Sequence, residues 1–125
     1  MSREYFVSNP QSPFSDAVLV DGKTLYISGR IGFLPGTTKV PDTATEEAHL
    51  VLQEFERILA MAGMTMDDLV SLQIFASDVS LWEEFNAVYR GYFKSGRLPA
   101  RAFLGSGRLL GDARFELMGI AVKGD

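Results

Sequence analysis

The stretch that decides the fold is Arg114-Phe115-Glu116-Leu117-Met118-Gly119-Ile120-Ala121-Val122, which lies close to the end of the chain. Its odd-numbered positions from Phe115 onward are apolar or glycine, and the even-numbered positions after Glu116 are apolar as well. Successive side chains of a strand point to opposite faces of the sheet. A strand that is apolar on both faces is typical of burial on both sides. The stretch therefore predicts a central strand, with Glu116 as a charged residue inside it.

Five segments upstream have the composition of further strands, namely residues 4–7, 17–20, 24–28, 69–75 and 100–104. Asp21-Gly22 separates the second segment from the third and is a hairpin-turn signal. Residues 69–75 alternate between apolar and polar side chains, as a half-buried strand does. Residues 29–39 contain three glycines and a proline, so we interpret them as an irregular loop.

A capping box, Thr43-Ala44-Thr45-Glu46, begins the first predicted helix. Gly63 follows the helical pattern and is the residue type that most often ends a helix. Between these two signals, apolar side chains recur at helical spacing, at Ala48, Val51, Leu52, Phe55, Ile58, Leu59 and Ala62. The pattern predicts an amphipathic helix that buries one face.

A second capping box, Ser80-Leu81-Trp82-Glu83, begins the second predicted helix. Gly96 and Pro99 are the signals that end it. One face of this helix is lined by aromatic and branched side chains, which are Phe85, Val88, Tyr89, Tyr92 and Phe93. We interpret Trp82, in its first turn, as a packing residue.

The elements follow the order β-β-β-α-β-α-β-β within a single domain, residues 1–125. This order predicts an α+β fold in which two helices cover one face of a mixed sheet. The second face of the sheet also contains apolar residues, and no further element remains to cover it. A two-layer domain can bury such a face by self-association, so we expect a closed homo-oligomer.

The composition excludes several classes of function. The chain has no cysteine, one histidine and no metal-ligand cluster in its sequence, so neither thiolate chemistry nor a metal site is expected. A net charge of −4 and a pI near 5.0 argue against a nucleic-acid partner. No apolar run reaches the roughly 20 residues of a membrane span, and no apolar signal core opens the chain. We therefore expect a cytoplasmic protein without a membrane partner.

Two residues near the end of the chain are the leading candidates for chemistry. Arg101 lies in Leu98-Pro99-Ala100-Arg101-Ala102-Phe103, at the start of a predicted strand, and Glu116 lies inside the next one. A planar guanidinium can bind a carboxylate through two parallel hydrogen bonds. A glutamate beside it could move a proton or orient a water molecule.

Three stretches together resemble the YjgF/RidA (reactive intermediate deaminase) family: Tyr26-Ile27-Ser28-Gly29, Phe85-Asn86-Ala87-Val88-Tyr89, and Leu98-Pro99-Ala100-Arg101-Ala102 followed by Arg114-Phe115-Glu116. The resemblance implies a chorismate-mutase-like subunit and a homotrimer whose sheets form a central barrel, with ligand clefts between subunits. It also implies hydrolysis of 2-imino acids and their enamine tautomers to 2-keto acids and ammonia, without a metal or organic cofactor.

The resemblance also implies roles for individual residues. Arg101 matches the family's substrate-binding arginine, and Glu116 matches the glutamate that would assist attack by water. Ser28 and Gly29 stand where the family's backbone approaches the ligand, and Asn86 stands near the cleft. On physical grounds alone, each residue has a structural alternative: a salt bridge for Arg101 or Glu116, a strand-end turn for Ser28 and Gly29, and a surface position for Asn86.

Several positions depart from the family pattern. Phe14 replaces a tyrosine, so the substrate would meet an apolar wall without a hydroxyl. Phe103 stands where relatives carry a small residue, a cysteine or a tyrosine, and it is expected to narrow the pocket or to change the side chain that the pocket prefers. Arg30 replaces a glutamine and places a second cation near the site. Met118 and Leu110 replace a glutamate and a proline.

These departures motivate a second hypothesis, in which the same cleft binds a keto acid or another small carboxylate without catalysis and regulates a partner. A ribonuclease activity is a third hypothesis, and the acidic balance of the chain argues against it.

Overall fold

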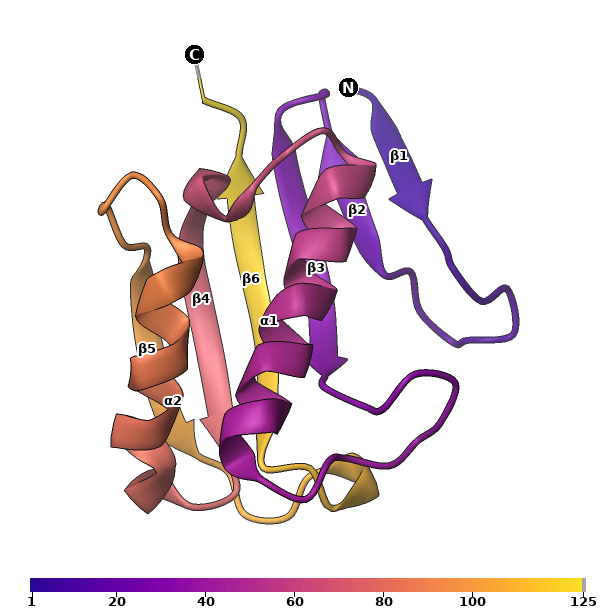
Figure 1. Ribbon diagram of the computed structural model, residues 1–125. Helices are drawn as coiled ribbons and strands as arrows, with labels where there is room; N and C mark the ends of the chain where they lie inside the picture. The colour runs from indigo at the N-terminus through magenta and orange to yellow at the C-terminus, as the bar shows by residue number, and fades with distance from the viewer. Residues whose placement is uncertain (125) are drawn as a thin grey trace.

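The computed structural model describes residues 1–124, and its elements follow the predicted order (Figure 1). The two helices are α1 (Ala44–Met61) and α2 (Trp82–Tyr89). The six strands are β1 (Arg3–Phe6), β2 (Ala17–Val20), β3 (Thr24–Ile31), β4 (Leu69–Ala76), β5 (Ala100–Gly105) and β6 (Phe115–Val122). Neither helix is both long and apolar enough to cross a membrane within residues 1–124.

The strands form one mixed sheet in the order β1-β2-β3-β6-β4-β5. Only β4 and β5 run parallel, and they are joined by the crossover that contains α2. Figure 1 shows both helices in front of the sheet, on the same face. The predicted α+β architecture is therefore confirmed, and β6 is a central strand as its sequence indicated.

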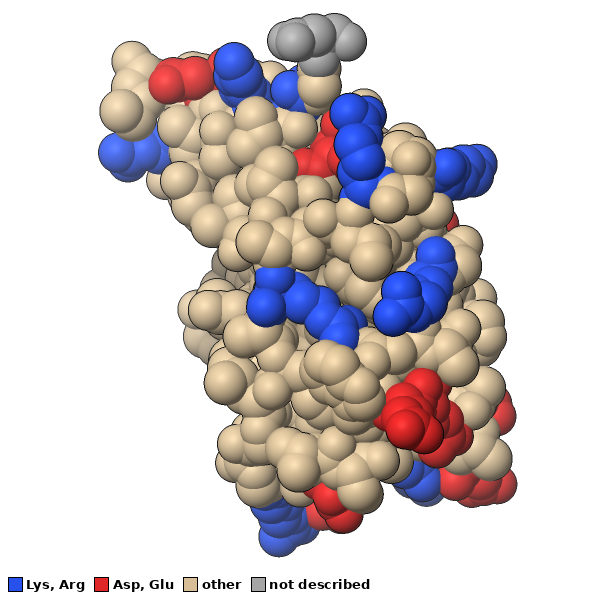
Figure 2. Space-filling model, turned by 90° about the vertical axis from the view of Figure 1, so that its left-hand side faces the viewer, with Lys and Arg blue, Asp and Glu red and all other residues tan. Residues whose placement is uncertain are grey.

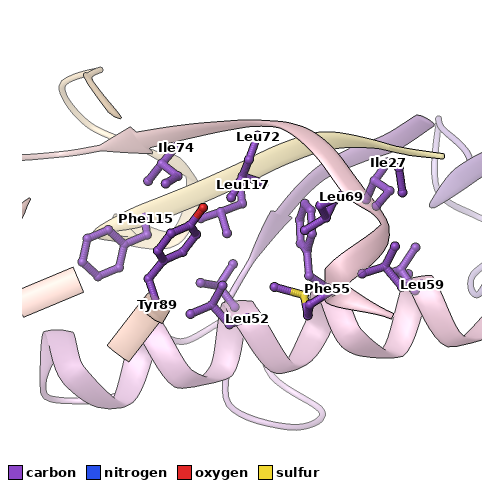
Figure 3. Close-up of a cluster of buried hydrophobic side chains, with 14 of the residues drawn as sticks. Ile27, Leu52, Phe55, Leu59, Leu69, Leu72, Ile74, Tyr89, Phe115 and Leu117 are labelled. Carbon is purple, nitrogen blue, oxygen red and sulfur yellow. The ribbon is translucent and has the colours of Figure 1, made fainter. Parts of the chain in front are cut away.

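The hydrophobic core lies between the helices and one face of the sheet. Phe115 and Leu117 of β6 are fully buried, and they face Leu52 and Phe55 of α1 in Figure 3. Helix α1 begins at the predicted cap, because the Thr43 side chain accepts a hydrogen bond from the Glu46 backbone N–H. Burial of these side chains fixes α1 along the length of the sheet.

A buried carboxylate attaches α1 to the start of β6. Glu47 is 0 % exposed, and it accepts hydrogen bonds from the backbone N–H groups of Arg114 and Phe115, at 2.7 and 3.1 Å. The Arg114 guanidinium adds an ion pair to Glu47 at 2.9 Å and also donates to the carbonyl oxygens of Pro41 and Asp42. This network, which we call the Glu47 clamp, fixes the strand residue that precedes Glu116.

Strand β3 is longer than the sequence predicted. The irregular loop expected from residue 29 begins later, because Arg30 and Ile31 pair with Leu117 and Glu116 of β6. The register shifts between Ile27 and Arg30, which leaves Ser28 and Gly29 in a β-bulge. Pairing with a distant strand holds the glycine-containing segment extended, and no local signal reports that pairing.

The second helix differs from its prediction at both ends. Asp78, and not Ser80, supplies the cap, since its side chain accepts from the Ser80 backbone N–H and begins a 3₁₀ turn, Val79–Leu81. Helix α2 follows that turn without a side-chain cap and ends at Tyr89, well before Gly96, in a second 3₁₀ turn, Arg90–Tyr92. The capping box predicted at Ser80 was wrong because an acceptor two residues earlier takes its place.

The second face of the sheet is open in the single chain. Tyr26 is 50 % exposed and Met118 is 41 % exposed. Together with Val18 and Ile120 they line a hollow of about 380 Å³ on this face. We call it the open face, and it contains the apolar positions of β6 that the sequence marked for burial.

Candidate functional site

Arg101 lies on the helix-covered face of the sheet, beneath α2. Its strand partner in β4 is Leu72, which is fully buried on that face. The guanidinium carbon lies 4.6 Å from the ring centre of Tyr89, 4.9 Å from that of Trp82 and 5.9 Å from that of Phe103. Such rings attract a cation through their negative faces. We call these three residues the aromatic cage of Arg101.

The hydrogen-bonding capacity of Arg101 is only partly used. Its Nη2 donates to Asn86 Oδ1 at 2.6 Å, whereas its Nη1 is buried and has no hydrogen-bond partner within residues 1–124. No carboxylate of the described residues lies within ion-pair distance of Arg101. The structure thus gives no support to an ordinary salt bridge and leaves one donor of a fixed cation available for an anion.

The neighbouring tyrosine shares this environment. Tyr89 is 3 % exposed, and its hydroxyl has no hydrogen-bond partner within residues 1–124. Burial raises the pKa of the Tyr89 hydroxyl, and the positive charge of Arg101 only partly opposes that effect. Tyr89 is therefore neutral near pH 7 and can donate a hydrogen bond to a ligand that reaches Arg101.

This side of the molecule has a mainly uncharged surface. Figure 2 shows the side on which α2 and β5 lie, with basic groups in the middle of a broad tan area and acidic groups both above and below them. Large apolar side chains are exposed on these elements and the segments next to them, namely Val79, Trp82, Leu98 and Leu104. Exposed apolar groups around a cation indicate a binding surface.

Glu116 lies elsewhere, in the lining of a separate pocket. This pocket has a volume of about 810 Å³ and is lined in part by Phe14, Gly29 and Glu116. A Cβ atom added to Gly29 would lie 2.2 Å from Glu116 Oε2, so only glycine permits this approach of the carboxylate. Phe14 is 49 % exposed and forms part of the wall.

One chain does not bring Arg101 and Glu116 together. Glu116 pairs with Phe75, and its neighbour Leu117 pairs with Ile74, so Glu116 points to the open face whereas Leu117 points to the core. Arg101 shares the face of the core residues. The strand register places the two side chains on opposite faces of one chain, so their meeting in a cleft between subunits stays a prediction.

The remaining candidate residues have partners of their own. Arg30 forms an ion pair with Asp16 at 2.8 Å, and its Nε lies 3.6 Å from a Glu54 oxygen, so it is not a free cation. Burial would raise the pKa of Asp16, but hydrogen bonds from Ser8 and Arg30 outweigh that effect and lower it. The Ser28 hydroxyl donates to the Ser15 carbonyl oxygen at 2.5 Å and fixes the bulge.

Phe103 and Asn86 lie next to Arg101, as the sequence led us to expect. Trp82 and Tyr89 also lie next to Arg101, although the sequence did not predict them as site residues. The Phe103 ring packs edge-on against Trp82, with centroids 5.4 Å apart. The interpretation of Trp82 as a packing residue was incomplete, since the residue is 49 % exposed and its ring lies against Arg101. The spacing of Trp82, Asn86 and Tyr89 along one face of α2 is the signal that would have grouped them.

Comparisons with known proteins agree with the fold. A model of the endoribonuclease L-PSP family matches residues 7–123. The human 2-iminobutanoate/2-iminopropanoate deaminase is 36% identical over 113 residues, which are 90% of this chain and 81% of that protein. A RutC family protein of Aquifex aeolicus is 35% identical over 115 residues, 91% of each chain.

A solved structure extends the agreement to three dimensions. A member of the YjgF protein family from Neisseria meningitidis matches with a TM-score of 0.84 at 29% identity, covering 100% of this chain and 98% of that chain. The fold thus places this chain in the chorismate-mutase-like class. Within that class, the chain belongs to the endoribonuclease L-PSP family, which is the YjgF/RidA family.

Proposed function

We propose that this protein hydrolyses reactive 2-imino acids and their enamine tautomers to 2-keto acids and ammonia. The observation that supports this most directly is Arg101, a cation in an aromatic cage with a free donor and no carboxylate partner within residues 1–124. A 2-imino acid carries the carboxylate that such a group binds. The human relative is named for this activity.

The site is proposed to form between copies of the chain in a cytoplasmic homotrimer. Arg101 lies toward the β5 edge of the sheet, and Glu116 points to the open face. If the β5 edge of one copy packed against the open face of the next, Arg101 of the first copy would lie close to Glu116 of the second. The exposed apolar residues Tyr26 and Met118 give that contact a hydrophobic driving force. Analytical ultracentrifugation should then give three times the 13.8 kDa of one chain.

In this arrangement, Arg101 and Asn86 of one copy would hold the substrate carboxylate, with Phe103 beside them. Gly29 of the next copy has no side chain, so the imine carbon could approach the backbone of that copy. Glu116 of the same copy would orient the water that attacks the imine carbon. Glu116 would accept a proton from the water as the water oxygen bonds to the imine carbon, and would pass that proton to the imine nitrogen. It would then move the hydroxyl proton of the resulting carbinolamine to the same nitrogen, so that the keto group forms as ammonia leaves. Holding the two reactants together is a proximity effect.

The test measures keto-acid formation from imines that an amino-acid oxidase generates in situ. Arg101→Ala should lower kcat/KM by about 100-fold, because it removes charge-assisted hydrogen bonds to the carboxylate. Arg3→Ala, a matched change on the exposed strand β1, should leave the rate unchanged. Full activity of Arg101→Ala would overturn the proposal.

A second candidate function is binding of a small carboxylate without catalysis. Phe14 favours it, because this side chain has no hydroxyl with which to place a water or a substrate proton. Stabilisation of the fold by a 2-keto acid, together with no acceleration of imine hydrolysis, would support this alternative.

A further inference from the structure

The pocket of about 810 Å³ beside Glu116 is formed by one chain alone. It lies between α1 and the segment that joins β3 to α1, and Phe14 from the β1–β2 connection closes one side. Figure 1 shows these two connections projecting beside α1. The pocket has room for more of a substrate than the reacting atoms of an imino acid.

The walls of this pocket are mainly apolar. Phe14, Ile31, Phe33 and Leu34 line it, and Leu110 lies at the end near Glu116. Apolar walls of this kind favour burial of an apolar group, because they remove it from water.

Three of the four charged residues that line the pocket, Arg30, Glu54 and Arg57, are already in ion pairs, and the fourth is Glu116 at its edge. Glu54 accepts two hydrogen bonds from Arg57, at 2.8 and 2.9 Å, and Arg30 pairs with Asp16. A guest with a charged end would have to compete with these pairs. The lining therefore suits an uncharged, apolar guest.

The wall is supported from behind. Gly111 has a φ of 64°, and a Cβ atom added there would lie 2.8 Å from Phe33 Cε1. The loop before β6 therefore packs directly against the Phe33 ring. This contact connects the wall of the pocket to the loop that leads into the strand carrying Glu116.

We infer that this pocket binds the side chain of the imino acid and selects bulky apolar side chains, whether branched or aromatic. The inference rests on the proposed function. With the substrate carboxylate at Arg101 and the imine carbon beside Glu116, the side chain extends into the pocket that Gly29 and Glu116 border. The methyl group of 2-iminopropanoate or the ethyl group of 2-iminobutanoate would leave most of it unfilled.

The experiment compares kcat/KM for the imines of alanine, leucine and phenylalanine. The two bulky imines should exceed the alanine imine by about tenfold or more, since each buried methylene contributes substantially to discrimination. Leu34→Trp, which fills the pocket, should lower the ratio of bulky to small rates by about tenfold. Val7→Trp, a somewhat larger addition at an exposed position outside the pocket lining, should leave all three rates unchanged.

Binding of the product-like keto acids gives a second readout that does not need turnover. Thermal stabilisation by 4-methyl-2-oxopentanoate should exceed that by pyruvate, and Leu34→Trp should remove the difference. Equal rates and equal stabilisation for small and bulky compounds would overturn the inference while leaving the deaminase proposal intact. Selective stabilisation by the bulky keto acid without turnover of any imine would instead support the pocket and refute the activity.

Discussion

The Glu47 clamp offers the most direct test of how this structure is held together. Glu47 is fully buried, and it accepts three hydrogen bonds, two from backbone N–H groups and one from Arg114. Glu47→Gln preserves the size of the side chain but removes its charge. An amide can accept through only one of its two terminal atoms, so at least one of these donors loses its partner.

Loss of one member of a buried ion pair costs about 3–5 kcal/mol. The Arg114 side chain is 29% exposed and can regain some hydration, so we expect a value near the lower end, about 3 kcal/mol. That is a large part of the roughly 5–15 kcal/mol that stabilises a typical domain. At an m-value of about 1–3 kcal/mol per molar urea, the unfolding midpoint should fall by about 1–3 M.

The assay is urea denaturation followed by circular dichroism at one fixed protein concentration, because self-association would make the midpoint depend on concentration. Glu46→Gln is the matched control, since Glu46 precedes Glu47 on the same helix but is exposed, and its change should cost about 1 kcal/mol or less. If Glu47→Gln shifts the midpoint no more than Glu46→Gln does, the assignment of the clamp as the main anchor of β6 is refuted.

Three other predictions concern the site and its surroundings. Gly29→Ala should displace the Glu116 carboxylate and lower kcat by up to about 100-fold. Circular dichroism should show that the variant keeps the fold, and an unchanged kcat would contradict the role of Glu116. Trp82 is the only tryptophan of the chain, and its ring centre lies 4.9 Å from the Arg101 guanidinium carbon. Binding of pyruvate at Arg101 should therefore change the tryptophan fluorescence. A constant fluorescence signal at saturating pyruvate would argue against the site. Folding lowers the pKa of Asp16, so its contribution to stability is complete above about pH 4 and disappears as the pH falls through the folded-state pKa. Asp16→Asn should therefore destabilise the protein at pH 7, and this loss of unfolding free energy should shrink as the pH falls below about 4. A loss that stays constant down to the lowest pH at which the protein remains folded would contradict this linkage.

The comparison of α1 with β3 shows how far local sequence determines structure. The cap at Thr43, the helical spacing and the stop at Gly63, which has a φ of 71°, all act within a few residues, and the helix agrees with them. Strand β3 continues to Ile31 because β6 provides backbone partners from far along the chain. A glycine-containing segment gives no sign of a partner that lies so distant in sequence.

The candidate site shows the same division. The sequence by itself determined the order of the elements, the long first helix, the central strand and Arg101 as the leading candidate for an anion. Only the tertiary structure decided that Glu116 lies on the other face, that Trp82 and Tyr89 surround Arg101, and that Glu47 anchors a strand 67 residues away. Periodicity and capping are properties of neighbouring residues, whereas register and pocket shape depend on which distant segments pack together.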